Sequence, residues 1–306
     1  MSAAEVVADG LAFPEGPAWC DDGTVVVVAV ASGTVHRVRP ATGEVERIAD
    51  PGGGPNAALL ASDGGIVITQ NGGVDFAGRF PDVAEPRRVA PGIQHIAPDG
   101  QVSDVWARGA LAPNDLAVTG DGALWWTDPG PVPPVPGRRI GRVLTLPTDG
   151  DGRVVCAGLE FCNGIAVMPA GDVVVVEQRG LLRVADGGMA EWVVRDVGPG
   201  GADGFAVDVD GRYYVAAARD HVVRVLDPDG SPVEVIELPG DGFTTNCCFG
   251  GDDLRTLFVT DGLPGRLLAW EGAPAPGLPL RRWERPGGDG ESATVLTAFR
   301  SDEGGR

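Results

Sequence analysis

The sequence predicts an all-β fold, a six-bladed β-propeller around a central channel, and three observations indicate it. Six positions recur in one register along the 306-residue chain. Each begins an apolar stretch, a turn and a second apolar stretch. These stretches are rich in Val, Ile, Trp and Tyr and are bounded by Asp-Gly, which is typical of strands and hairpins. The recurring positions lie 40 to 58 residues apart, and repeats of about 40–50 residues are typical of propellers and solenoids.

The recurring position holds only side chains with carboxylate or amide oxygens, and we call this set the polar ring: Glu15, Asn56, Asn114, Asn163, Asp203 and Asn246. Five members stand eight residues before a glycine, whereas Asn246 has Leu254 at that offset. A repeat normally preserves apolar core residues. This one preserves the hard oxygen donors that a divalent cation prefers.

The second strand of each hairpin is expected, in chain order, at residues 24–30, 65–70, 123–128, 172–178, 212–217 and 256–261. A first strand, beginning at the polar ring, precedes each of them. No long stretch shows a helical period. Closure into six four-stranded blades is favoured because radial repetition leaves only short edges, whereas a solenoid would leave long exposed ones.

The geometry of the hairpin predicts where the polar ring lies. A turn at i+7 and i+8 places residue i roughly opposite i+15, at the open end of the blade. If the first strand lines the channel, the polar ring converges at one mouth and forms a metal-binding channel. The residues at i+14 and i+15 are expected to join it there: Gln70, Asn71, Asp128, Glu177, Gln178, Thr260 and Asp261.

Composition limits the class of protein. The net charge of −19 argues against nucleic acid and anionic membranes as partners, and no run approaches the roughly 20 apolar residues of a membrane span. Residues 1–306 read as one propeller domain, with a frayed tail at about 300–306. The N-terminus has no basic or apolar signal region. The five cysteines lack metal-binding spacing and indicate free thiols in a reducing, cytoplasmic setting.

Other catalytic constellations are weakly represented. No G-x-S-x-G elbow, P-loop or dinucleotide fingerprint is present. Cys162 precedes Asn163, but a nucleophilic cysteine needs a paired base, and the repeat places no histidine beside it. His95 lies in the long segment between the second and third ring positions, so it is either a surface residue or one that folds over the mouth to contact a ligand.

Several ordered motifs carry a resemblance to a known family: "FPEGPAW", "PNDLAV" followed by "DGALWWTDP", "CNGIAV" and "ADGFAVD". They resemble the senescence marker protein/regucalcin/gluconolactonase family, in particular its bacterial gluconolactonase branch. The resemblance implies a six-bladed propeller that binds one divalent metal ion and hydrolyses sugar lactones. Relatives hydrolyse other lactones, aryl esters or organophosphates.

By motif, the resemblance places metal ligands at Glu15, Asn163 and Asp203, and puts Asn114 against the metal or the substrate. Oxygen ligation favours Ca²⁺, with Mg²⁺, Mn²⁺ or Fe²⁺ as alternatives. Ala112 stands where regucalcin-type members have an arginine that helps to hold the sugar. With Trp126 expected at the mouth, this substitution suggests a less polar substrate. Asn56 and His95 complete the candidate substrate-binding residues.

The resulting hypothesis is a metal-dependent hydrolase that opens a lactone, either a sugar lactone or a less polar one. The metal polarises the carbonyl while a carboxylate accepts a proton from the attacking water. Asp203 is the first candidate for this base, followed by Asp128 and Glu177. Two alternatives stay open. One is another metal-dependent enzyme on the same scaffold: an esterase, a phosphotriesterase-like hydrolase or a non-hydrolytic tailoring enzyme. The other is a non-catalytic metal- or ligand-binding propeller. The oligomeric state does not follow from the sequence.

Overall fold

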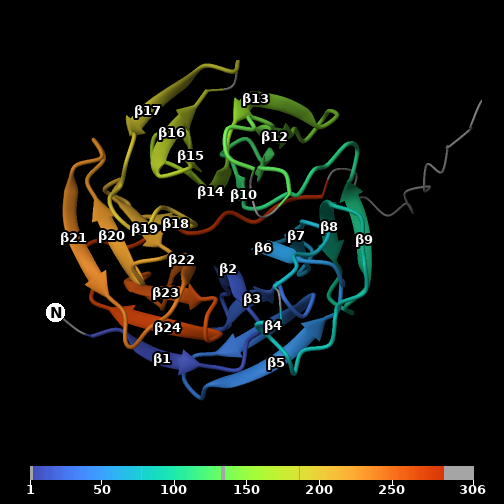
Figure 1. Ribbon diagram of the computed structural model, residues 1–306, viewed down its shortest axis with the longest axis vertical. Helices are drawn as coiled ribbons and strands as arrows, with labels where there is room; N and C mark the ends of the chain where they lie inside the picture. Colours follow the sequence, from blue (N-terminus) through green and yellow to red (C-terminus); the bar gives the residue numbers. More distant parts are fainter. Residues whose placement is uncertain (1–2, 77, 132–134, 186, 286–306) are drawn as a thin grey trace, which may run out of the picture.

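The computed structural model describes residues 3–76, 78–131, 135–185 and 187–285. These residues form six four-stranded antiparallel sheets, arranged as blades around a centre (Figure 1). The predicted all-β, six-bladed propeller is therefore confirmed. The predicted tail at about 300–306 lies outside the described residues.

The blades follow one another in chain order. The first three consist of β2 (Pro14–Trp19), β3 (Val25–Ala29), β4 (Thr34–Arg39) and β5 (Glu44–Ala49); β6 (Pro55–Leu60), β7 (Ile66–Gln70), β8 (Gly92–Ile96) and β9 (Val102–Trp106); and β10 (Leu116–Val118), β11 (Leu124–Asp128), β12 (Gly141–Leu146) and β13 (Arg153–Leu159). The last three consist of β14 (Cys162–Val167), β15 (Val173–Glu177), β16 (Gly180–Val184) and β17 (Ala190–Val194); β18 (Phe205–Val207), β19 (Tyr213–Ala217), β20 (Val222–Leu226) and β21 (Pro232–Glu237); and β22 (Thr244–Gly250), β23 (Thr256–Asp261), β24 (Arg266–Glu271) and β1 (Glu5–Ala8).

Two segments near the chain ends close the propeller. Strand β1 pairs with β24 and supplies the outermost strand of the last blade, so the first and last parts of the chain share one sheet. Residues 272–285, which we call the C-terminal strap, cross the channel (Figure 1, red). The strap bridges Asp208 through Gly277 on one side and Ala61 through Trp283 on the other. Both partners lie at the turn ends of their hairpins, so the strap covers the end of the channel opposite the polar ring.

The recurring glycine eight residues after the ring position has a conformational cause. At Gly23, Gly64, Gly122, Gly171 and Gly211 the backbone φ lies between 80° and 95°, a region that residues with a side chain rarely adopt. The sixth blade meets the same turn with Leu254, whose φ is 55°. The repeat therefore preserves a backbone conformation, and Leu254 adopts it at an energetic cost.

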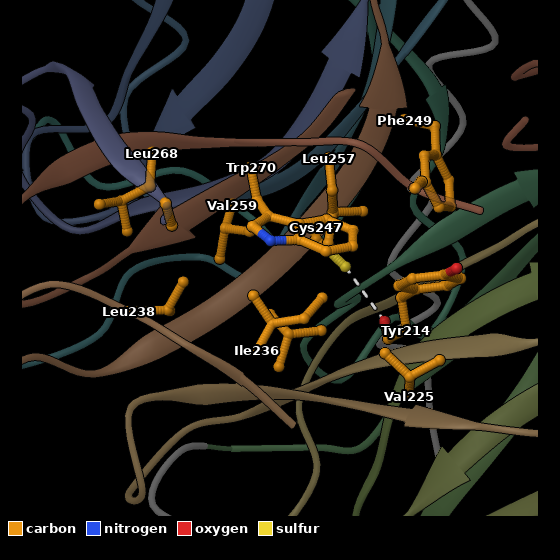
Figure 2. Close-up of a cluster of buried hydrophobic side chains, with 13 residues drawn as sticks. Tyr214, Val225, Ile236, Leu238, Cys247, Phe249, Leu257, Val259, Leu268 and Trp270 are labelled. Atoms are coloured by element: carbon orange, nitrogen blue, oxygen red, sulfur yellow. Dashed lines mark hydrogen bonds between the residues drawn. The ribbon is translucent and has the colours of Figure 1, made fainter. Parts of the chain in front are cut away.

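The hydrophobic core lies between neighbouring blades. In one cluster Tyr214, Val223 and Val225 of one blade pack against Cys247, Leu257 and Val259 of the next (Figure 2). Both faces of each sheet are covered in this way, so the second strands are apolar without alternation. All five cysteines are free and buried. Among the described residues, no helix is long and apolar enough to span a membrane.

The register of the innermost hairpins differs from the prediction. Glu15 pairs with Val28 instead of facing a residue at i+15. The hairpin beyond is centred near i+7, as in the pair Trp19↔Val25, and an irregularity between Glu15 and Ala18 shifts the ladder by one residue. The second and fourth blades show the same irregularity beside the ring position. Pattern alone locates the turn but not the bulge.

Candidate functional site

The polar ring lies on, or just before, the innermost strands β2, β6, β10, β14, β18 and β22, which gather around the channel (Figure 1). Glu15, Asn56, Asn114, Asn163 and Asn246 are each less than 8% exposed, whereas Asp203 is partly exposed. Glycines that follow ring residues allow this convergence. A Cβ on Gly16 would lie 2.2 Å from the Ala57 Cα, and one on Gly204 would lie 2.0 Å from the Asn246 amide carbon.

The structure adds a carboxylate that the sequence reasoning missed. Asp115 is only 5% exposed, and both its oxygens accept bonds from Asn246 Nδ2, at 3.1 and 3.0 Å. Strict strand alternation would send neighbours 114 and 115 to opposite sides. However, Asp115 precedes β10, and its amide donates to Thr127 Oγ1 at 3.1 Å. The signal available in the sequence was the acid that directly follows a ring asparagine in "PND".

Glu15, Asp115 and Asp203 form a carboxylate cluster inside the channel. Burial raises the pKa of Glu15 well above its usual value, and the negative charges of Asp203 and Asp115 raise it further. Burial and the charge of Asp115 likewise raise the pKa of Asp203, and burial raises the pKa of Asp115 to about 7. Each anion is thus costly to hold without a compensating cation.

Amide groups surround the cluster in two different ways. The side chains of Asn246 and Asn163 lie beside Glu15 and Asp203, respectively, where they favour the charged carboxylate and lower its pKa. In contrast, Asn56 Oδ1 and Asn114 Oδ1 are buried without a hydrogen-bond partner. A buried polar oxygen without a partner is rare because it loses its hydration. Its presence beside mutually repelling carboxylates fits a bound cation.

A metal site in the channel would need both carboxylate and amide oxygens. Among the described residues, no three His, Cys, Asp or Glu side chains are placed to hold a metal ion by themselves. Glu15 and Asp203 would supply charge, while Asn114 and Asn163 would supply neutral oxygens. This all-oxygen set suits Ca²⁺ or Mg²⁺ better than zinc, which prefers nitrogen and sulfur ligands.

The carboxylates predicted as reserve bases, Asp128 and Glu177, are engaged elsewhere. Asp128 is fully buried and accepts the Ala112 amide at 2.7 Å and the Arg142 guanidinium at 2.7 Å. Glu177 accepts the amide of Glu160 at 2.8 Å. These contacts tie each second strand to the loop that leads into its own blade. A catalytic role for either carboxylate stays a prediction, and their contacts are those of structural groups.

The same contact recurs around the propeller. Gln70 Oε1 accepts the Gly54 amide at 2.6 Å, and Asp261 Oδ1 accepts the Phe243 amide at 2.8 Å. In four blades, therefore, the residue at the end of the second strand fixes the loop before a ring residue. These side chains belong to the mouth as predicted, but as loop anchors.

Two predicted substrate contacts are corrected by the structure. Trp126 is fully buried between blades, where its ring lies 4.9 Å from that of Trp106. Both faces of β11 are covered, so alternation cannot present this side chain to the mouth. His95 belongs to strand β8 rather than to a loop, is 2% exposed, and places Nε2 3.0 Å from Asp63 Oδ2. Asp63 lies in the hairpin turn, at the opposite end of the blade from the ring.

Beneath the polar ring the channel is hollow. A cavity of about 360 Å³ is lined by the innermost strands, including Asp115, Leu59 and Phe205, and is bounded by Leu278–Arg281 of the C-terminal strap. The strap covers this end, so the polar ring is approached from the other mouth.

Position 112, where the resemblance predicts a sugar-holding arginine, carries an uncharged side chain. Ala112 is buried, and its amide is committed to Asp128. The guanidinium of Arg142 does not replace the missing arginine, because it bonds to Asp128 and the Gly109 carbonyl.

Comparisons with known proteins agree with this architecture. Residues 13–262 match the family described as the SMP-30/Gluconolactonase/LRE-like region. A 6-deoxy-6-sulfogluconolactonase from Pseudomonas putida is 27% identical over 266 residues, covering 82% of this chain and 84% of that protein. A solved gluconolactonase structure from Xanthomonas campestris has a TM-score of 0.69 and 25% identity, covering 88% of this chain and 89% of that one.

Regucalcin from Bos taurus is 41% identical over 70 residues, which is 22% of this chain and 23% of that protein. This chain therefore aligns with less than a quarter of the regucalcin's length, whereas the family match runs through all six blades. The chain belongs to the SMP-30/gluconolactonase/LRE-like family.

Proposed function

We propose that the protein is a metal-dependent lactone hydrolase. The observation that carries the proposal is the carboxylate cluster, surrounded by buried amide oxygens of which two have no partner. Family membership and the two gluconolactonases among its relatives support the substrate class. Glu15, Asn114, Asn163 and Asp203 would hold the cation, with Ca²⁺ preferred and Mg²⁺, Mn²⁺ or Fe²⁺ as alternatives.

A divalent cation at these residues would polarise the lactone carbonyl and stabilise negative charge on its oxygen, a contribution of several kcal/mol. The protein's own groups perform the proton transfer. Asp203 is the ring carboxylate that keeps water-accessible surface, which suits it to accept a proton from the attacking water. The side chain of Asn163 lies beside Asp203 and favours the charged form of that carboxylate.

The covered far end of the channel supports entry of substrate from the mouth that carries the polar ring. Asp115 accepts hydrogen bonds from Asn246, whose side chain lies beside Glu15. The substrate we propose is a lactone less polar than a sugar lactone, because Ala112 stands where the resemblance predicts a sugar-holding arginine.

A pH-stat assay over a panel of lactones and esters tests the proposal. Acid release should stop after treatment with EDTA and return when Ca²⁺ or another divalent ion is restored. A binding protein would retain metal and release no acid from any member of the panel. Activity that is unaffected by verified removal of metal would overturn the mechanism.

A further inference from the structure

Four phenylalanines gather on the side of the channel mouth next to Glu15, and we call them the phenylalanine cluster: Phe13, Phe76, Phe80 and Phe243. The ring of Phe13 lies 4.7 Å from that of Phe76, 6.4 Å from that of Phe80 and 6.0 Å from that of Phe243. The rings of Phe76 and Phe80 are 5.4 Å apart and nearly perpendicular. These are the separations of aromatic side chains in direct contact.

Chain position places the cluster at the mouth. Phe13 comes two residues before Glu15, and Phe243 comes three residues before Asn246. Phe76 and Phe80 lie in the segment that follows Gln70, at the ring end of β7. The four side chains therefore come from three neighbouring blades and border the same opening as the carboxylate cluster.

The neighbourhood is shaped to admit these rings. A Cβ on Gly262 would stand 2.8 Å from the ring of Phe13 and 2.9 Å from the methyl group of Thr245. Thr245 donates to the Pro14 carbonyl at 2.8 Å, which joins β22 to β2. Phe13 itself has a φ of 59°, a rare conformation for a bulky residue. Strain of this kind clusters at functional sites.

The exposure of the cluster distinguishes it from core packing. Phe205, Phe249 and Phe258 are each no more than 5% exposed between the blades. All four members of the phenylalanine cluster are only half-buried, although their rings contact one another. A contiguous apolar surface that stays open to solvent beside a polar site is typical of a ligand contact.

We propose that the phenylalanine cluster binds an alkyl or aryl substituent of the lactone and so determines substrate specificity. The inference rests on the proposed function for its substrate class. It assigns a physical basis to the preference for less polar lactones. A substituent on the lactone ring would lie against Phe13 and Phe76 while the carbonyl faces the polar ring.

The test compares kcat/KM for an unsubstituted five-membered lactone with that for the same lactone carrying a six-carbon chain. Each methylene removed from water contributes up to about fourfold, so we expect the wild type to favour the alkylated lactone by at least about tenfold. Phe76→Ala and Phe80→Ala should each reduce that ratio about threefold or more and leave the unsubstituted lactone within about twofold of wild type. Phe76→Leu, which keeps apolar volume, should lie between.

Phe161→Ala is the matched control, since Phe161 precedes Asn163 on another blade and is outside the cluster. It should leave the ratio unchanged. An unchanged ratio in Phe76→Ala and Phe80→Ala, in protein with a wild-type thermal midpoint, would overturn the proposal. If one of the alanine variants does not fold, the test uses Phe76→Leu and the alanine variant that folds. An unchanged ratio in both would overturn the proposal.

A binding experiment separates this proposal from the hydrolase assignment. Calorimetric titration with the unsubstituted lactam and the alkylated lactam measures affinity without ester hydrolysis. Tighter binding of the alkylated lactam, lost in Phe80→Ala, supports the cluster even if no lactone is hydrolysed, in which case only the hydrolase assignment fails. Equal affinity for both lactams would overturn the role of the cluster.

Discussion

Removal of the metal should destabilise the protein by an amount that depends on pH. Glu15, Asp115 and Asp203 all have a raised pKa in the folded protein because of burial and mutual repulsion. In the unfolded chain these groups titrate near pH 4. Between about pH 4 and 7 the metal-free folded protein therefore binds more protons than the unfolded chain. Its stability falls as the pH rises through that window.

The magnitude follows from linkage. A cation that binds only the folded state, at a hundredfold excess over its Kd, stabilises by about 2.7 kcal/mol. At about 2.1 cal/mol/K per residue, a chain of 306 residues has an unfolding entropy near 640 cal/mol/K, so chelation at pH 8 should lower the thermal midpoint by about 4 °C. At pH 5, two units below the value of about 7 for Asp115, a cation bound beside this carboxylate must displace its proton, which weakens binding about a hundredfold. The stabilisation then shrinks to about 0.4 kcal/mol, less than 1 °C.

Differential scanning calorimetry at pH 8 and pH 5, with and without EDTA and with metal content verified, measures these shifts. Asp203→Asn removes one of the repelling charges, so its midpoint should fall less on chelation than that of the wild type. An unchanged wild-type midpoint at pH 8 after metal removal would show that the carboxylates do not share a cation. A drop of equal size at both pH values would refute the role of proton competition.

Four further predictions follow from individual contacts. Glu15→Gln and Asn163→Ala should each lower metal content per chain after dialysis, measured by mass spectrometry, and full occupancy in both would refute the ligand assignment. Because Ala112 replaces the arginine that the resemblance predicts for holding a sugar, an alkyl-substituted lactone should exceed a sugar lactone in kcat/KM; a sugar lactone ahead by tenfold, about 1.4 kcal/mol, would contradict this. Gly171→Ala should cost about 1–2 kcal/mol in urea unfolding, since φ is 95° and the added methyl group meets open space; a neutral effect would show that the turn relaxes. Asp128→Ala should destabilise by about 3 kcal/mol and leave kcat within about threefold if its contacts are structural, whereas a thousandfold loss of kcat in folded protein would support its predicted catalytic role.

Local chemistry was enough to determine the fold from the sequence. Apolar runs and Asp-Gly turns predict the hairpins, and the repeated glycine in a left-handed conformation marks the turns in which it occurs. The polar ring was visible for the same reason, because a repeat that keeps Glu15, Asn163 and Asp203 in register keeps them in one place in space. The sixth blade, which has Leu254 in place of the glycine, follows the same rule, since the Leu254 backbone adopts the left-handed conformation.

Other features were decided only by the tertiary structure. They depend on one-residue shifts in strand register and on contacts between distant segments. The irregularities after the ring positions change strand register, and Asp115 enters the channel through its bond to Asn246, 131 residues away. Trp126, in contrast, is removed from the mouth, because the neighbouring blade packs over its side chain. The C-terminal strap and the phenylalanine cluster likewise arise from long-range packing, which no local pattern encodes. Sequence periodicity therefore determines which blade and which end a residue occupies, whereas the structure determines which atoms meet there.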